Sequence, residues 1–99
     1  LQLLSLANNA LTTIPSSLGN LSMLKELNLA RNELTTLPSS LGKLSNLQKL
    51  YLEENQLTAL PRLLGDLSNL QLLYLYGNAL TDQNPVVVAL KGKGCKVYL

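Results

Sequence analysis

The sequence is built from four copies of one leucine pattern that recur at a constant interval. Each copy has two leucines separated by two other residues, a third leucine after one more, and then an asparagine. The copies begin at Leu1, Leu24, Leu47 and Leu70, which is a 23-residue period. A fixed period of this length predicts a solenoid, in which each repeat stacks only on its neighbours and broad faces stay open. We therefore expect a surface that binds other molecules rather than a catalytic centre.

The first half of each repeat has the pattern of a β-strand. Leu50, Tyr51 and Leu52 alternate between two sides, and we expect a strand of about three to five residues there and in each equivalent position. Because every repeat runs the same way round the coil, successive strands should pair in parallel. The asparagine side chain that follows each strand can satisfy backbone groups of the turn. We assign this structural role to Asn9, Asn32, Asn55 and Asn78.

The second half of each repeat is typical of a short helical turn. Prolines at positions 15, 38 and 61 fix the backbone at the start of this convex segment. Glycines at positions 19, 42 and 65 are expected to end it. The spacing fits either an α-helical or a 3-10 turn and does not choose between them.

The fourth copy departs from the pattern after Leu80. Its proline arrives one residue late, as Pro85, and Asn84 stands before it as a helix N-cap. We expect a slightly longer helix there, broken near Gly92, and a fifth strand over residues 95–99. The one-residue insertion places Val97 in the register of Leu73. The whole chain, residues 1–99, is then a single domain with repeats 1–23, 24–46, 47–69 and 70–92, the last one irregular.

The other end of the chain has no such closing device. Leu1 already lies inside the pattern, so we expect that an N-terminal cap is lacking and that the inward Leu4 and Leu6 are poorly covered. A bare edge of this kind invites pairing. Missing repeats, a partner or a second copy of the chain are the alternatives, and the last would make a homo-oligomer.

Composition removes several classes of function. The chain has no histidine and a lone Cys95, which excludes an internal disulfide and a Cys/His catalytic pair and leaves no metal or cofactor site to expect. A net charge of +2 is too small to indicate nucleic acid. No run approaches the ~18 apolar residues of a membrane span. The absence of paired cysteines favours an intracellular protein.

These patterns resemble those of the leucine-rich repeat proteins, in the subtype with 23-residue units and an LPxxLGxL second half. The resemblance covers residues 1–80 and all four leucine patterns. It implies an α/β fold: a right-handed, horseshoe-shaped solenoid with a parallel sheet on the concave side and short helical turns on the convex side. It also implies protein recognition, usually by the concave face. The subtype is similar to that of intracellular scaffolds, signalling adaptors and bacterial effectors that are secreted into host cells.

Residues between the leucines should point out from the concave face, because side chains alternate along a strand. The repeats differ mainly at these outward positions, and the third and fourth repeats gather tyrosines there. Exposed tyrosine beside charge is typical of binding surfaces, although tyrosines also stack on one another in any parallel ladder. The charged positions also fit a solvated face with weak ion pairs. The predicted partner-binding residues are Tyr51, Tyr74, Tyr76, Leu72, Glu53, Arg31, Glu26 and Lys49.

The sequence thus favours a protein–protein interaction module that binds through the concave face and is not an enzyme. Two alternatives stay open. In the first alternative, the chain is the targeting part of a larger enzyme or effector. In the second, it is a structural or engineered scaffold that assembles with itself. The identity of the partner does not follow from the pattern.

Overall fold

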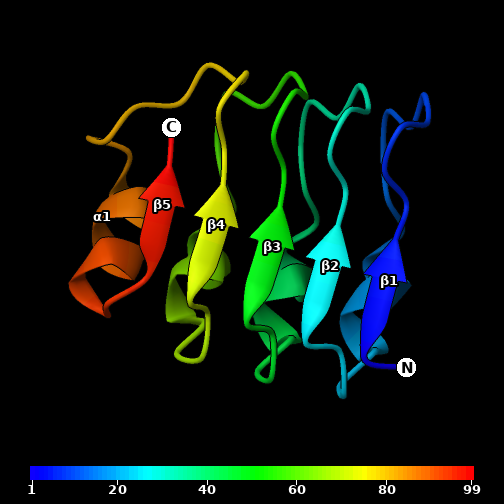
Figure 1. The fold of residues 1–99 in the computed structure, drawn as a ribbon, viewed down its shortest axis with the longest axis horizontal. Helices are drawn as coiled ribbons and strands as arrows, with labels where there is room; N and C mark the ends of the chain where they lie inside the picture. The colour runs from blue at the N-terminus through cyan, green and yellow to red at the C-terminus, as the bar shows by residue number, and fades with distance from the viewer.

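The computed structural model describes residues 1–99 and contains one parallel sheet of five three-residue strands in chain order. Figure 1 shows the strands side by side, all pointing the same way, with the helical segments behind one face. This arrangement confirms the predicted parallel-sheet solenoid. The strands are β1 (Leu3–Ser5), β2 (Glu26–Asn28), β3 (Lys49–Tyr51), β4 (Leu72–Tyr74) and β5 (Lys96–Tyr98).

The sequence period fixes the register of the sheet. Leu4 pairs with Leu27, and from β1 to β4 every residue pairs with its equivalent in the next repeat. Between β4 and β5 the partner comes one position later than the period alone would place it, because Leu73 pairs with Val97. The predicted insertion in the fourth repeat is therefore confirmed, and the sheet accommodates it without losing register.

Leucines of the repeated pattern form a continuous core behind the sheet. Leu27, Leu50 and Leu73 are fully buried. Leu4 and Leu6, in the first repeat, are only partly buried and pack against the edge of the core. The difference arises because β1 has a neighbouring strand on one side only, whereas an inner repeat buries both of its flanks.

The convex segments are 3-10 helices, which decides between the two alternatives that the sequence left open. A 3-10 turn closes each hydrogen bond over one residue fewer than an α-helix does, so it suits a segment of five residues. A proline precedes each segment at its N-cap position, in extended conformation. The segments are η1 (Ser16–Asn20), η2 (Ser39–Lys43) and η3 (Arg62–Asp66).

The repeated glycines have a different role from the one expected. Gly19 and Gly42 lie inside their 3-10 segments, and each segment continues for one residue beyond its glycine. A Cβ atom on Gly42 would lie 2.7 Å from the carbonyl oxygen of Leu63 in the next repeat, and one on Gly19 would clash with the backbone of Ser40. The glycines allow close approach between repeats, so the prediction that they end the turn was wrong.

The fourth repeat replaces the 3-10 turn with helix α1 (Pro85–Gly92), which confirms the predicted helix. Asn84 caps it, because its side-chain oxygen accepts hydrogen bonds from the backbone nitrogens of Val86, at 2.9 Å, and Val87, at 3.3 Å. Gly94, with φ of 89°, turns the chain toward β5. With eight residues, α1 is too short to cross a bilayer, and it is the only α-helix.

Asparagine side chains join each repeat to the preceding one. Asn55 donates hydrogen bonds from Nδ2 to the carbonyl oxygens of Leu29, at 3.0 Å, and Leu52, at 3.1 Å, while its Oδ1 accepts one from the Leu34 nitrogen at 3.1 Å. Asn32 and Asn78 make the equivalent bonds. These three residues form what we call the asparagine ladder. Asn9 bonds only within its own turn and is exposed.

A second, shorter row of asparagines lies on the other side of the strands, in the segment that leads into each strand. Nδ2 of Asn46 donates to the carbonyl oxygen of Ser22 at 2.9 Å, and Nδ2 of Asn69 donates to that of Ser45 at 2.8 Å. The first repeat carries Met23 at this position. This row was not predicted, although asparagine at the same position of two successive repeats is a visible signal in the sequence.

The asparagine ladder gives a stability prediction. Replacing Asn55 with alanine leaves the buried Leu34 nitrogen without an acceptor and removes one of the two asparagine bonds to each of the carbonyl oxygens of Leu29 and Leu52. We expect a loss of about 2–3 kcal/mol in unfolding free energy. The control is Asn9→Ala, which removes bonds within one exposed turn and should cost less than about 1 kcal/mol. Urea denaturation followed by circular dichroism measures both. Equal losses of stability in the two variants would show that the hydrogen bonds between repeats contribute no more than those within a single turn.

Candidate partner-binding face

The candidate site is the face of the sheet turned away from the 3-10 segments and α1, which we call the open face. It corresponds to the predicted concave face. Figure 1 looks onto it, with the helical segments behind. The outward positions of the strands are exposed or half-buried, as their alternation with buried leucines predicts. They form a first column of Leu3, Glu26, Lys49, Leu72 and Lys96 and a second column of Ser5, Asn28, Tyr51, Tyr74 and Tyr98.

Three tyrosines of the second column stack on one another, and we call them the tyrosine stack. The ring centroids of Tyr51 and Tyr74 lie 5.0 Å apart with an interplanar angle of 6°. Those of Tyr74 and Tyr98 lie 4.8 Å apart at 13°. The rings face each other because paired residues in a parallel sheet lie one strand spacing apart, and contacts of this kind stabilise by about 0.5–1.5 kcal/mol per pair.

Tyr98 was not among the predicted binding residues. The signal was available, because the one-residue insertion that places Val97 opposite Leu73 also places Tyr98 opposite Tyr74. With 44% of its surface exposed, Tyr98 ends the stack on the last strand. The structure therefore extends the aromatic surface by one strand beyond the predicted pair.

Tyr76 does not belong to the stack. It follows β4, 42% of its surface is exposed, and it makes no aromatic pair. Its carbonyl oxygen accepts a hydrogen bond from the Glu54 nitrogen at 2.9 Å, which sets the two strand ends in register. Glu53 and Tyr76 therefore occupy neighbouring positions at one border of the tyrosine stack.

Arg31 and Glu54 form an ion pair at the same border, with 2.6 Å between Nε of Arg31 and Oε2 of Glu54. The hydrogen bond and the charge of Glu54 raise the pKa of Arg31, with smaller contributions from Tyr76 and Glu53. Both side chains are exposed, so water screens the pair and its contribution to stability is small. Its effect on the face is to neutralise the charge of Arg31 locally.

The backbone at this border turns sharply after each strand. Arg31 and Glu54 have φ of 57°, and Asn8 and Gly77, at the equivalent positions of the first and fourth repeats, also have positive φ. This conformation suits glycine and asparagine. Asparagine in the first repeat and glycine in the fourth at this position are the sequence signal for a left-handed turn, which was not predicted.

Glu53 has the least satisfied polar group on the open face. Its Oε1 atom is buried without a hydrogen-bond partner, and no protein group donates to its other carboxylate oxygen. Ala30, at the equivalent position of the second repeat, is buried. Its short side chain lies beside the longer Glu53, so little of it reaches the surface.

The remaining predicted residues lie on the opposite side of the tyrosine stack. Glu26, Lys49 and Leu72 occupy adjacent positions of the first column and are half-buried. Lys96 continues this column on β5. The structure thus divides the predicted set into two borders, with the tyrosine stack between them.

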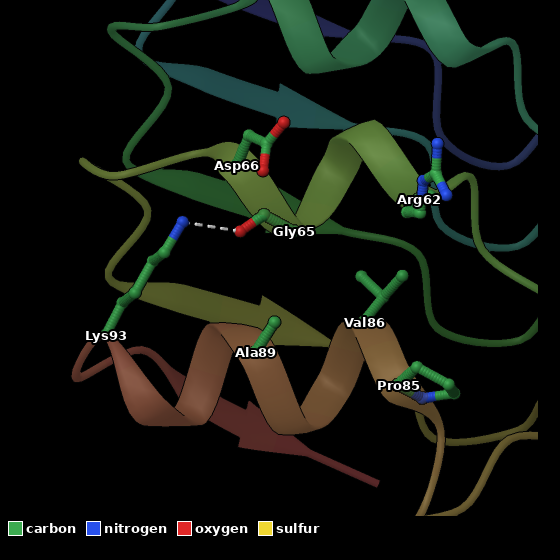
Figure 2. A pocket seen from close by; sticks show the side chains of 7 residues that line it. All are labelled: Arg62, Gly65, Asp66, Pro85, Val86, Ala89 and Lys93. Atoms are coloured by element: carbon green, nitrogen blue, oxygen red, sulfur yellow. Dashed lines mark hydrogen bonds between the residues drawn. The ribbon is translucent and has the colours of Figure 1, made fainter.

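A shallow hollow lies behind the sheet, between η3 and α1, and Figure 2 shows the side chains around it. Its volume is about 200 Å³. Lys93 closes one end, where Nζ donates to the carbonyl oxygen of Gly65 at 2.8 Å. The hollow exists because α1 lies farther from Gly65 than a 3-10 segment would, and a Cβ atom on Gly65 would stand 3.4 Å from that of Ala89. The lining residues are Arg62, Gly65, Asp66, Pro85, Val86, Ala89 and Lys93.

Cys95 lies just before β5, in the core. Burial raises the pKa of its thiol to about 11, so the thiol is neutral at ordinary pH and a poor nucleophile. The side chains bring together no group of three or more histidine, cysteine, aspartate or glutamate residues.

The edge of β1 carries exposed leucines. Leu1 is 70% exposed, whereas Leu24 and Leu47, its counterparts in the next two repeats, are fully buried. Leu3 is 57% exposed at the start of the first column. The edge thus offers an apolar strip and unpaired strand groups beside the open face.

Comparison with known proteins agrees with this geometry. A family model described as leucine rich repeat matches residues 1–57 and again residues 24–80. The overlapping matches together cover the four leucine patterns. No curated protein sequence matches the chain.

Two solved structures show how far the similarity extends. A leucine-rich repeat protein of Leptospira interrogans is 35% identical, with a TM-score of 0.91 over 100% of this chain and 25% of that one. An internalin from Listeria monocytogenes is 29% identical, with a TM-score of 0.80 over 99% of this chain and 28% of that one. The chain therefore spans about a quarter of the length of each of these proteins.

The hollow at Gly65 gives a paired prediction. Gly65→Ala places a methyl group in ordinary contact with Ala89 and reduces the freedom of the unfolded chain, so we expect a gain of about 0.4–1 kcal/mol in stability. Gly42→Ala drives the same methyl group into the backbone of Leu63 and should lose about 1–3 kcal/mol. Chemical denaturation of both variants measures the difference. Equal losses would mean that the glycines are required by the turn itself.

Proposed function

The chain belongs to the leucine-rich repeat family, and from that premise we propose that its open face binds a partner protein. Domains of this family generally mediate protein–protein interaction and are typically not enzymes. The observation that carries the proposal is the tyrosine stack of Tyr51, Tyr74 and Tyr98, which stands half-exposed between two borders of charged and apolar residues.

The physical properties of the stack suit binding. Tyrosine contributes a large contact area and a hydroxyl group while losing few rotatable bonds when it is held. Stacking already fixes the three rings against one another, so part of the ordering cost of association is absent. Stacking within the ladder and partner binding, the two explanations that the sequence offered for the tyrosines, are therefore compatible. Packing in the free protein holds the rings ready for contact with a partner.

The residues that flank the stack extend the proposed surface. Leu72 and Lys49 lie at one border, and Tyr76 and Glu53 lie at the other. An apolar centre with polar and charged surroundings is the usual anatomy of a protein interface. The proposed partner-contacting set therefore keeps the residues predicted from sequence and adds Tyr98, while Arg31 acts through its pair with Glu54.

Size supports a surface that extends beyond these strands. Five strands spaced about 4.8 Å apart span roughly 20 Å, whereas a stable interface buries about 800 Å² on each partner. This chain also covers about a quarter of each similar structure. We infer that the open face is one part of a larger binding surface. Both similar structures come from bacteria. Their origin supports the secreted bacterial protein among the alternatives expected from the sequence.

The test combines three substitutions on the face with a matched control. The wild-type chain first captures a partner protein from a lysate. The variant Tyr51→Ala/Tyr74→Ala/Tyr76→Ala should bind that same protein at least about tenfold more weakly, because hot-spot tyrosines are removed. The control, Leu63→Ala/Val88→Ala, removes exposed apolar side chains from the back of the molecule. Circular dichroism first establishes that both variants fold. Undiminished capture by the tyrosine variant would overturn the proposal.

Self-association through the β1 edge is the second candidate, and the exposed Leu1 and Leu3 are the observation that favours it. In that case the chain should sediment as concentration-dependent oligomers with no other protein present. Leu3→Lys should then return it to a monomer, because a charge at a strand edge deters pairing. Monomeric sedimentation across the accessible concentration range would remove this candidate.

A further inference from the structure

The carboxylate of Glu53 is unusual among the charged groups of this protein. Its Oε1 atom is buried and unpaired although the side chain as a whole reaches the surface. A buried carboxylate oxygen without a donor is costly, because it has lost water and gained no hydrogen bond. A donor supplied from outside the chain would remove that cost, so the group is prepared for a ligand that donates hydrogen bonds.

The surrounding charges favour a cation as that donor. The positive side chain at this border is Arg31, and it is already bound to Glu54. The three residues Arg31, Glu53 and Glu54 therefore carry one uncompensated negative charge. Lys49 begins the strand that Glu53 follows, on the other side of the tyrosine stack. The chain thus provides no second cation to neutralise Glu53.

An aromatic residue follows the neighbouring strand at the position equivalent to Glu53. Tyr76 occupies the neighbouring position in the next repeat, 42% of its surface is exposed, and neither of its ring faces is used in a stack. A free aromatic face attracts a cation, and the attraction is greatest for a planar group that can lie flat on the ring. Glu53 and Tyr76 together offer a carboxylate and a ring to one incoming side chain.

We propose that the open face receives an arginine side chain of its protein partner, bound by the carboxylate of Glu53 and lying against the ring of Tyr76. This inference rests on the proposed function, since it names the chemistry of the partner at that face. A guanidinium group fits because it is planar and donates two parallel hydrogen bonds to a carboxylate. The terminal torsion of glutamate is broad, so the carboxylate group can turn at little cost to present both of its oxygens to the guanidinium group.

A small probe tests the site without the natural partner. The full chain, labelled with ¹⁵N and ¹³C, is titrated with N-acetyl-arginine amide while NMR follows the side-chain and backbone signals. N-acetyl-citrulline amide is the control ligand, because it has nearly the same shape and no charge. Glu33 and Asp82, exposed carboxylates away from the tyrosines, are internal controls in the same sample.

We expect the arginine probe to shift the signals of Glu53 and Tyr76 at least about threefold more than those of Glu33 and Asp82, with the citrulline probe producing no such preference. Glu53→Gln should abolish the preference, whereas Glu33→Gln, which changes the net charge equally, should leave it intact. Equal shifts at all carboxylates, or equal shifts from both probes, would overturn the arginine inference.

The same variants separate this inference from the proposed function. If Glu53→Gln captures the partner as well as the wild type does while the tyrosine variant loses it, the arginine site is wrong and the binding face stands. If both variants capture the partner undiminished, the proposed function itself fails. Loss of capture by Glu53→Gln, together with normal capture by Glu33→Gln, supports both.

Discussion

The side-chain amide of asparagine at the end of each strand is the interaction on which the rest of this structure depends. Asn32, Asn55 and Asn78 each bond the backbone of their own repeat and that of the repeat before. These bonds are buried or half-buried, so water does not readily replace one that is lost. Because each asparagine must reach the same carbonyl of its neighbour, successive repeats keep one register.

The open face inherits its order from that register. Tyr51, Tyr74 and Tyr98 stack because equivalent positions of adjacent repeats lie one strand spacing apart. On the back of the molecule the same spacing forces backbones together, and only glycine fits at positions 19 and 42. Where α1 replaces a 3-10 segment the constraint is relaxed, and a hollow forms above Gly65. Both faces are thus consequences of how closely the repeats are stacked.

The parts of the candidate site that could be predicted are those that follow from period alone. The period placed Tyr51 beside Tyr74, and the inserted residue in the fourth repeat was enough to place Tyr98 as well, although that step was missed. The period did not reveal that Arg31 pairs with Glu54 or that Glu53 is left without a donor. Long side chains choose among several rotamers, and their partners depend on turns whose shape the pattern does not state.

The sequence by itself determined the solenoid, the parallel register, the inward leucines and the shift of the last strand, because a short repeat of this kind can bury its leucines only by stacking on a copy of itself. The tertiary structure alone decided between α and 3-10 turns, showed that Gly42 is required by a neighbour rather than by its own turn, and left the carboxylate of Glu53 unpaired. These features depend on small differences in the distances between neighbouring repeats, and a periodic sequence pattern carries no information about such differences.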